Sequence, residues 1–241
     1  MRRHRLCCFT PRLNMVAFFC QSCRSRLDYR PASRAHAAPV ARASYTYFDM
    51  RLFIGIPLAA PVIEQLEKIS IRHRMEGDGL RWSTPESWHI TLQFLGSASE
   101  AQYECIVARL HEMRAAPVPI ELEELGFFDR AGIFFAGIAI TPGLVALQQN
   151  VIAATCPCGF TPEDRPYHPH ITLARSKGRR NATGLTKLKA RIRHQPKFEP
   201  FVAEELLLYE SFTRPTGSQY ETRERFRLGP RSEKCTAAAA K

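Results

Sequence analysis

The tetrapeptide HITL occurs twice in this chain, at residues 89–92 and at residues 170–173, each time inside an apolar run. Short apolar runs bounded by turn residues are typical of buried β-strands. Successive side chains of a strand point to opposite faces, so the histidine and the threonine of each copy share one face. The four candidate residues are His89, Thr91, His170 and Thr172.

Two such strands side by side would place two imidazoles and two hydroxyls around one cavity. Histidine titrates near neutral pH, so one imidazole can act as a base while the other acts as an acid. Hydroxyl groups can donate to oxygens on which negative charge develops during a displacement. The set suits an anion that is attacked on one side and released on the other, and a phosphodiester is the favoured anion.

The two copies are preceded by phenylalanines at similar distances along the sequence. Phe53 precedes His89 by 36 residues, and Phe135 precedes His170 by 35. Apolar periodicity predicts a first half with strands at residues 53–56, 88–95 and 118–125 and helices at 60–75 and 99–113. It predicts a second half with strands at residues 134–139, 169–174, 202–209 and 220–228 and helices at 142–154 and 183–192.

This self-similarity predicts an α+β protein of two pseudo-symmetric lobes related by an approximate two-fold axis. In each lobe, helices would cover one face of a mainly antiparallel sheet. One HITL copy from each lobe would then face a shared cleft. The last two strands and the helix before them are expected to complete the second lobe.

The composition is that of a globular chain. Of its 241 residues, 45% are hydrophobic, and no apolar run approaches the roughly 20 residues of a membrane-spanning helix. The net charge is +11, but residues 1–49 carry nine Arg and two Asp, a net +7 that leaves +4 for the rest. A mildly basic globular part favours brief contact with RNA ends over stable binding of long duplex DNA.

The first 49 residues differ from the rest. They are rich in Arg and nearly free of acidic residues, and they show no sustained periodicity. We expect residues 1–49 to be a disordered leader or upstream sequence from an over-long gene model, with the working protein beginning near Met50. Residues 50–230 would form the bilobal domain, and residues 231–241 a disordered tail.

The eight cysteines predict neither a disulfide scaffold nor a metal centre. Cys105 falls in a helical pattern and is expected only to pack, since a chain with a large apolar core needs no disulfide. A reducing, cytoplasmic setting follows as the default. Cys20 and Cys23 have the spacing of half a zinc ribbon without a second pair, and His168 beside His170 lacks a third ligand.

Several segments in the same order resemble a known family, the two-histidine (2H) phosphoesterases. The match is to the RNA 2',3'-cyclic phosphodiesterases, also called 2'-5' RNA ligases, and it covers residues 50–228 but not the leader. Two positions depart from the pattern: Gln93 stands where the family often has Lys, and His168 where it often has a basic or bulky residue. The segments are MRLFIGIP at 50–57, LRW at 80–82, WHITLQFLG at 88–96, PHITLAR at 169–175, LYES at 208–211 and GSQYE at 217–221.

The resemblance implies a bilobal 2H phosphoesterase fold and a hydrolysis that needs no metal and no cofactor. The substrates would be RNA ends or nucleotides that carry a 2',3'-cyclic phosphate, opened to 2'-phosphomonoesters, with a weak reverse 2'-5' ligation. His170 would be the base and His89 the acid, while Thr91 and Thr172 would donate to the phosphoryl oxygens. We expect the protein to act as a monomer, away from membranes.

The resemblance also makes Arg175 a phosphate contact. Arg175 lies five residues after His170, and this odd spacing puts it on the opposite strand face unless the strand ends or bulges first. The alternative is an arginine in a surface ion pair. Three aromatic residues could either stack a terminal base or pack in the core; they are Trp82, Tyr167 and Tyr209.

Two other classes of function stay open. One is a different phosphodiesterase on the same scaffold, acting on 2'-5' oligonucleotides or on an ADP-ribose cyclic phosphate, because loops choose the substrate around a fixed reaction centre. The other is a non-catalytic module that binds RNA ends or nucleotide phosphates. A single histidine of this kind would more often be a buried strand residue, but the repeat with threonine at the same offset argues against that interpretation.

Overall fold

The computed structural model describes residues 50–177, 182–214 and 217–229. The leader at 1–49, with Cys20 and Cys23, and the tail at 231–241 lie outside the described residues. The helices are α1 (Ala60–His73), α2 (Glu100–Glu112), α3 (Pro142–Thr155) and α4 (Ala182–Arg191), with short 3-10 turns η2 (Pro85–Ser87) and η3 (Cys156–Cys158). The strands are β1 (Met50–Pro57), β2 (Leu80–Trp82), β3 (His89–Ala98), β4 (Val118–Ile120), β5 (Leu122–Phe128), β6 (Ile133–Ile138), β7 (His170–Ser176), β8 (Phe201–Ala203), β9 (Glu205–Arg214) and β10 (Gly217–Arg227).

The strands form two four-stranded sheets, as the α+β prediction requires. The first has the order β10-β9-β1-β3 and the second the order β2-β7-β6-β5, and every paired strand is antiparallel to its neighbour. One HITL copy begins each of β3 and β7, so each sheet carries one copy. No described helix is long and apolar enough to cross a membrane.

The two sheets are not the two sequence halves, and in this respect the prediction was wrong. The strand β5 from the first half pairs with β6, while β9 and β10 from the second half join β1. The strand β2 of the first half likewise pairs with β7, so each four-stranded sheet takes two of its strands from the other half of the chain. Apolar periodicity shows which face of a strand is buried, but it does not show which strand lies beside it, because backbone hydrogen bonds between strands join segments far apart in sequence.

Two predicted strands are each divided into two in the structure. The stretch 118–125 becomes β4 and β5 on either side of Glu121, and the stretch 202–209 becomes β8 and β9 on either side of Glu204. The first parts pair with each other, with Val118 opposite Ala203, and the second parts then diverge into different sheets. This β4–β8 ladder joins the two halves at the point where their strands exchange.

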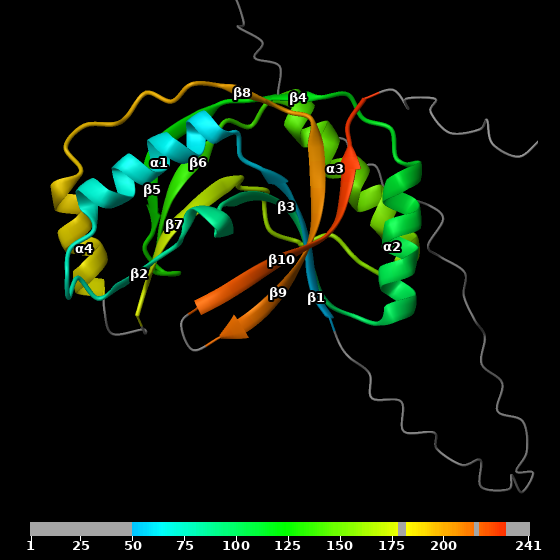
Figure 1. The fold of residues 1–241 in the computed structure, drawn as a ribbon, viewed down its shortest axis with the longest axis horizontal. Coiled ribbons are helices and arrows are strands. Elements are labelled where there is room, and N and C mark those ends of the chain that lie inside the picture. The colour runs from blue at the N-terminus through cyan, green and yellow to red at the C-terminus, as the bar shows by residue number, and fades with distance from the viewer. Residues whose placement is uncertain (1–49, 178–181, 215–216, 230–241) are drawn as a thin grey trace, which may run out of the picture. The chain divides into compact units, whose positions relative to one another are not determined.

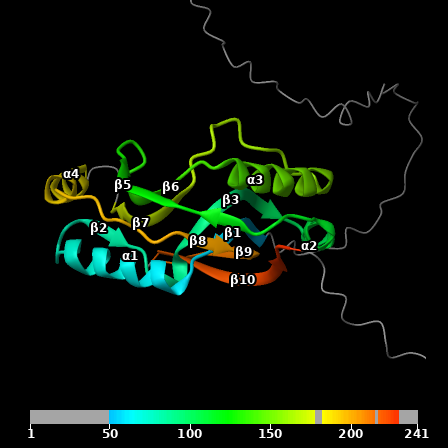
Figure 2. The same ribbon diagram turned by 90° about the horizontal axis from the view of Figure 1, so that it is seen from above.

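The helices exchange in the same way. In both ribbon views, α1 and α4 lie beside the sheet that contains β7, while α2 and α3 lie beside the sheet that contains β3 (Figure 1, Figure 2). The helix α1 begins with proline at its first turn, and α2 begins with a capping box in which Ser99 accepts from the backbone of Gln102. These signals explain why the helices begin where they do.

The HITL copies alternate as expected. Ile90 and Ile171 are completely buried, and Leu92 and Leu173 are nearly so. Burying one such aliphatic side chain stabilises the fold by roughly 1.5–3 kcal/mol. These isoleucines and leucines belong to one continuous core that draws residues from both sheets, and they anchor both histidine strands to it.

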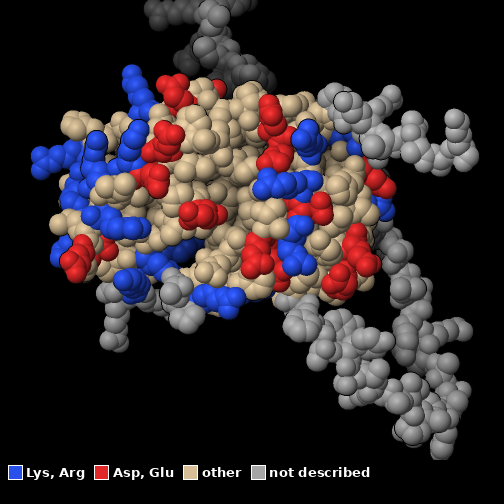
Figure 3. All heavy atoms as spheres, in the orientation of Figure 1, with Lys and Arg blue, Asp and Glu red and all other residues tan. Residues whose placement is uncertain are grey.

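Charged side chains are unevenly distributed over the surface. On the face shown in Figure 3, Lys and Arg gather over the side that carries α1 and α4, whereas basic and acidic side chains alternate on the opposite side. The mild net charge of the globular part therefore conceals a local basic surface.

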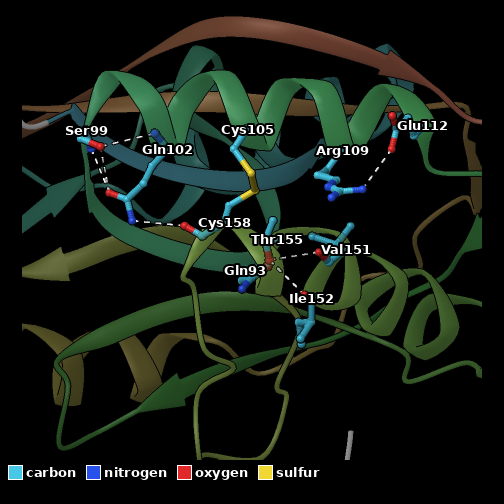
Figure 4. The surroundings of a disulfide bond; sticks show 10 residues. All are labelled: Gln93, Ser99, Gln102, Cys105, Arg109, Glu112, Val151, Ile152, Thr155 and Cys158. Carbon is cyan, nitrogen blue, oxygen red and sulfur yellow. Dashed lines mark hydrogen bonds and ion pairs between the residues drawn. A yellow bond between two sulfur atoms is a disulfide. The ribbon is translucent and has the colours of Figure 1, made fainter. Parts of the chain in front are cut away.

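A disulfide joins α2 to η3, contrary to the prediction for Cys105. The bond links Cys105 to Cys158, which are 53 residues apart in sequence (Figure 4). The side-chain amide of Gln102 donates to the Cys158 carbonyl at 3.3 Å beside it. Helical periodicity places Cys105 on a partly buried face but cannot show that the end of α3 packs against that face, and so the pairing was missed.

The disulfide should contribute measurably to stability. Closing a loop of this length restricts the unfolded chain, and removing such a bond costs about 2–5 kcal/mol. We expect the variant Cys105→Ser/Cys158→Ser to unfold at lower denaturant concentration than the oxidised protein, by that free energy. Denaturant titration with and without a reducing agent measures the difference, and Cys156→Ser is the matched control. Equal stability of the oxidised parent and the double variant would contradict this bond.

Candidate active site

A cleft of about 600 Å³ opens between the two sheets. Its walls carry residues of β1, β3 and β10 from the first sheet and of β2 and β7 from the second. All five residues singled out from the sequence line it: His89, Thr91, His170, Thr172 and Arg175. Residues separated by 81 positions in sequence, such as His89 and His170, therefore share one cavity.

The backbone orients both imidazoles in the same way. Nδ1 of His89 lies 2.8 Å from the carbonyl of Ser87, and Nδ1 of His170 lies 2.8 Å from the carbonyl of His168. A carbonyl oxygen can only accept, so each Nδ1 carries the hydrogen and donates it. In the neutral form, Nε2 of each ring is then the unprotonated nitrogen that can accept a proton.

Aromatic rings hold each imidazole in place. The ring centroids of Phe53 and His89 are 4.6 Å apart, and those of Phe135 and His170 are 5.4 Å apart. These are the two phenylalanines that precede the histidines by 36 and 35 residues in the sequence. Tyr220 adds an edge contact of 5.1 Å to His89, so the sheet neighbours restrict the ring orientation that proton transfer needs.

Gly55 makes room for the first histidine. It lies opposite Thr91 in the β1–β3 pair. A Cβ at Gly55 would come within 2.9 Å of the Ile90 carbonyl oxygen and 3.5 Å of Cδ2 of His89. A larger residue at this position would displace the strand or the imidazole.

Burial sets the proton affinity of both histidines. It lowers the pKa of His89 to about 4, the Ser87 carbonyl opposes this effect, and the charges of His170 and Arg175 add to it. Burial likewise lowers the pKa of His170, against the His168 carbonyl and with the charge of Arg175. Both imidazoles are therefore neutral at pH 7 while the cleft holds no anion.

A bulge resolves the question of where Arg175 points. In the β6–β7 pair, Phe135 lies opposite Thr172 but Phe134 lies opposite Ala174, so Leu173 is an extra residue. Both Leu173 and Ala174 are buried, and Arg175 returns to the face of Thr172. The strand therefore bulges between His170 and Arg175, and this is why Arg175 faces the cleft despite its odd spacing from His170.

The first motif strand has the same bulge with a different residue at its end. In the β1–β3 pair, Gly55 lies opposite Thr91 and Ile54 lies opposite Gln93, so Leu92 is the extra residue. Phe94 thereby takes the position that corresponds to Arg175 and lines the cleft with 57% of its surface exposed. One wall ends in a cation and the other in an aromatic ring.

The other aromatic candidates take different places. Tyr209 is buried and stacks on Phe53 at 4.8 Å, and Tyr167 donates its hydroxyl to the Thr91 carbonyl at 3.2 Å. Burial raises the pKa of Tyr209 to about 12. Trp82 lines the cleft, but its indole nitrogen donates to Asp78 at 2.8 Å. Packing thus accounts for Tyr209 and Tyr167.

The departures from the family pattern lie outside the catalytic surface. Gln93 is buried, and its Oε1 accepts from the hydroxyl of Thr155 at 2.8 Å between β3 and α3. Its amide nitrogen is buried without a hydrogen-bond partner. His168 contributes its carbonyl to His170, as noted above, while its side chain is exposed. Gln93 therefore links β3 to α3 and does not contact a ligand in the cleft.

Sequence reasoning missed Tyr220 and Arg81 as site residues. Tyr220 lines the cleft and makes an edge contact with the ring of His89. Arg81 lies directly opposite Arg175 in the β2–β7 pair and also lines the cleft. Both stand in segments that carry the family resemblance, but nothing in the local pattern shows which side of the sheet they face.

A comparison with protein families gives the family of this chain. The 2'-5' RNA ligase superfamily matches over residues 58–211, which include both HITL copies. The chain belongs to the 2'-5' RNA ligase superfamily. The resemblance drawn from separate sequence segments is confirmed.

Relatives in this superfamily are similar over different lengths. The RNA 2',3'-cyclic phosphodiesterase of Methanocaldococcus jannaschii is 30% identical over 71% of this chain and 97% of its own length. The Aeropyrum pernix protein of the same name is 40% identical over 43% of this chain. That match spans 61% of the relative's own length, which is less than two thirds of it. The crystal structure of E. coli LigT in apo form covers 76% of this chain and 99% of that one, with TM-score 0.64 and 25% identity.

The depressed pKa of His89 can be measured directly. Because the native pKa lies below the ordinary value of about 6.5, the unfolded chain binds this proton first on acidification. Stability linked to His89 is therefore present above pH 6.5 and is lost as the pH falls toward 4. NMR titration should find His89 titrating near 4, and His89→Gln should lose less stability over that range. Titration of His89 near 6.5 would contradict the burial described here.

Proposed function

We propose that this protein hydrolyses RNA 2',3'-cyclic phosphate ends to 2'-phosphomonoesters by acid–base catalysis with two histidines. The observation that carries the proposal is the placing of His89 and His170 on opposite sheets of one cleft, each with Nδ1 bound to a carbonyl. The relatives named RNA 2',3'-cyclic phosphodiesterase support the choice of substrate.

The arrangement suits an in-line displacement. One histidine takes a proton from water as the water oxygen attacks phosphorus, and the other gives a proton to the 3' oxygen as its bond to phosphorus breaks. The second bridging oxygen stays on phosphorus, which yields a 2'-phosphomonoester and a free 3' hydroxyl. Thr91 and Thr172 donate to the non-bridging oxygens, and Arg175 balances their negative charge.

The cleft offers the terminal nucleoside an apolar contact. Phe94 has an exposed aromatic face at the end of the first wall. Stacking of a base on such a ring contributes roughly 1–3 kcal/mol and tolerates any base. We propose that Phe94, and not Tyr209 or Tyr167, carries this contact.

Each histidine should be required for turnover. General acid or base catalysis is worth roughly 10²–10⁴ in rate, so His89→Ala and His170→Ala should each lower kcat by about that factor. Product analysis with a cyclic-ended oligonucleotide should give the 2'-phosphate, and excess chelator should leave the rate unchanged. Parent-like turnover by both variants would refute catalysis by this histidine pair. A parent that binds the RNA end without turning it over would leave only a binding module, and a need for divalent ions would favour metal catalysis.

The same assay separates related phosphodiesterases. A 2'-5' oligonucleotide or an ADP-ribose cyclic phosphate turned over faster than the RNA end would assign the cleft to those substrates. The monomeric state stays a prediction. The cytoplasmic location also stays a prediction. Its argument was that the chain needs no disulfide, and the bond between Cys105 and Cys158 removes that argument.

The roles of the two histidines depend on their proton affinities. The resemblance assigns His170 as the base and His89 as the acid. In the free protein, however, the larger pKa depression is at His89, so a proton shared by the pair resides on His170. These electrostatics favour the reverse order, with His89 as the base.

A leaving-group test distinguishes the two orders. Sulfur in place of the leaving 3' oxygen departs as a thiolate and needs no acid, so it should restore the rate of the variant that lacks the acid. We expect strong rescue of His170→Ala and weak rescue of His89→Ala, measured as the ratio of kcat for the sulfur and oxygen substrates. Rescue of His89→Ala alone would support the order implied by the resemblance.

A further inference from the structure

Two arginines lie side by side in the cleft. Arg81 and Arg175 are opposite residues of the antiparallel β2–β7 pair, and both line the cavity. Side chains opposite each other in such a pair have Cβ atoms about 4.5–5.5 Å apart. In the part of the chain that the structure describes, neither forms an ion pair with a carboxylate. Two adjacent like charges without a counter-ion are unfavourable unless an anion joins them.

A terminal cyclic phosphate does not supply enough negative charge for both. It carries one negative charge, and a single guanidinium can bind it with two parallel hydrogen bonds. One of the two arginines is therefore left over. On an RNA strand, the next anion is the phosphodiester that links the terminal nucleotide to the preceding one.

The side chain of Arg81 extends from β2 toward the first sheet. Its Cδ lies 3.3 Å from the position of a Cβ built on Gly217, the first residue of β10. Arg81 begins on the second sheet and reaches the first, so its side chain spans the two walls of the cleft beside Arg175. Gly217, with φ +139, leaves the space that the arginine occupies.

The part of the chain that contains β7 and α4 is strongly basic. Between Arg165 and Phe198 the sequence has ten Lys and Arg and no Asp or Glu, whereas residues 50–164 have eight basic and fourteen acidic residues. The described basic residues of this stretch that are exposed outside the cleft are Lys177, Lys187, Lys189, Arg193 and Lys197. The helix α4 lies on the side of the molecule on which Lys and Arg gather in Figure 3.

The helix α4 packs against α1 and against β2, where a Cβ on Gly184 would lie 3.2 Å from Cδ2 of Leu80. Arg191 donates to the His73 carbonyl at 2.9 Å, and Lys189 lies 3.6 Å from Asp129. The backbone of Lys177 donates to the Gly79 carbonyl at 2.9 Å, two residues before Arg81. The α4 surface therefore lies next to the strand that carries Arg81.

We propose that Arg81 binds the phosphodiester immediately 5' of the terminal cyclic phosphate, and that two exposed side chains, Lys187 on α4 and Arg193 just after it, bind phosphates further along the strand. The preferred substrate is then a single RNA strand and not a mononucleotide. This inference rests on the proposed function. Contacts to the backbone alone carry no sequence information, so the surface accepts strands of any sequence.

The test compares two substrates, a nucleoside 2',3'-cyclic phosphate and an RNA octamer with the same end. For the parent protein, we expect kcat/KM to be about tenfold higher for the octamer, with the advantage falling as salt rises because phosphate contacts release counter-ions. Arg81→Gln should lower the octamer-to-mononucleotide ratio of kcat/KM by about tenfold, mainly through KM. Lys187→Glu/Arg193→Glu should lower the same ratio, by roughly tenfold if two phosphate contacts are lost.

Arg227→Glu is the matched control. Arg227 is an exposed arginine at the opposite end of β10 from Gly217, and its substitution should leave the ratio unchanged. An equal loss for both substrates in Arg81→Gln would place Arg81 at the reacting phosphate and overturn the proposal, as would a parent that treats both substrates alike. Failure of the parent to hydrolyse either substrate would instead refute the proposed function itself.

Discussion

Antiparallel pairing between strands of different sequence halves is the constraint on which this structure depends. The β4–β8 ladder brings the halves together, and β5 and β9 then leave it to join β6 and β1. Each sheet is thus completed by two strands from the other half. The cleft exists because this exchange fixes β3 and β7 on facing sheets.

The exchange also explains why the site is held rigidly. Each imidazole is fixed by a carbonyl two residues earlier and by a phenylalanine on the neighbouring strand, so its orientation depends on the sheet and not on a loop. The two walls have the same backbone, including a bulge at Leu92 and at Leu173. They differ in the residue that follows the bulge, Phe94 on one wall and Arg175 on the other. A symmetric scaffold therefore gives an asymmetric cavity, with an apolar wall for a nucleoside and a cationic wall for phosphate.

Much of the fold could be predicted from the sequence because its signals are local. The alternation of His89 and Thr91 with buried Ile90 and Leu92 needs only the period of a strand. The similar spacing of Phe53 and Phe135 before the histidines, 36 and 35 residues, indicated the repeat, but the contacts of these rings with the imidazoles are seen only in the structure. The partner of Cys105 could not be predicted, because it lies 53 residues away on an element that periodicity does not place.

The sequence by itself determined the element types, the buried faces and the histidine–threonine repeat, since each follows from the order of neighbouring side chains. Only the tertiary structure decided which strands are neighbours, that the bulge at Leu173 turns Arg175 into the cleft, and that Arg81 lies beside it. The physical reason is that hydrogen bonds between strands join residues far apart in the chain. A shift of one residue in such a pair moves a side chain to the other face.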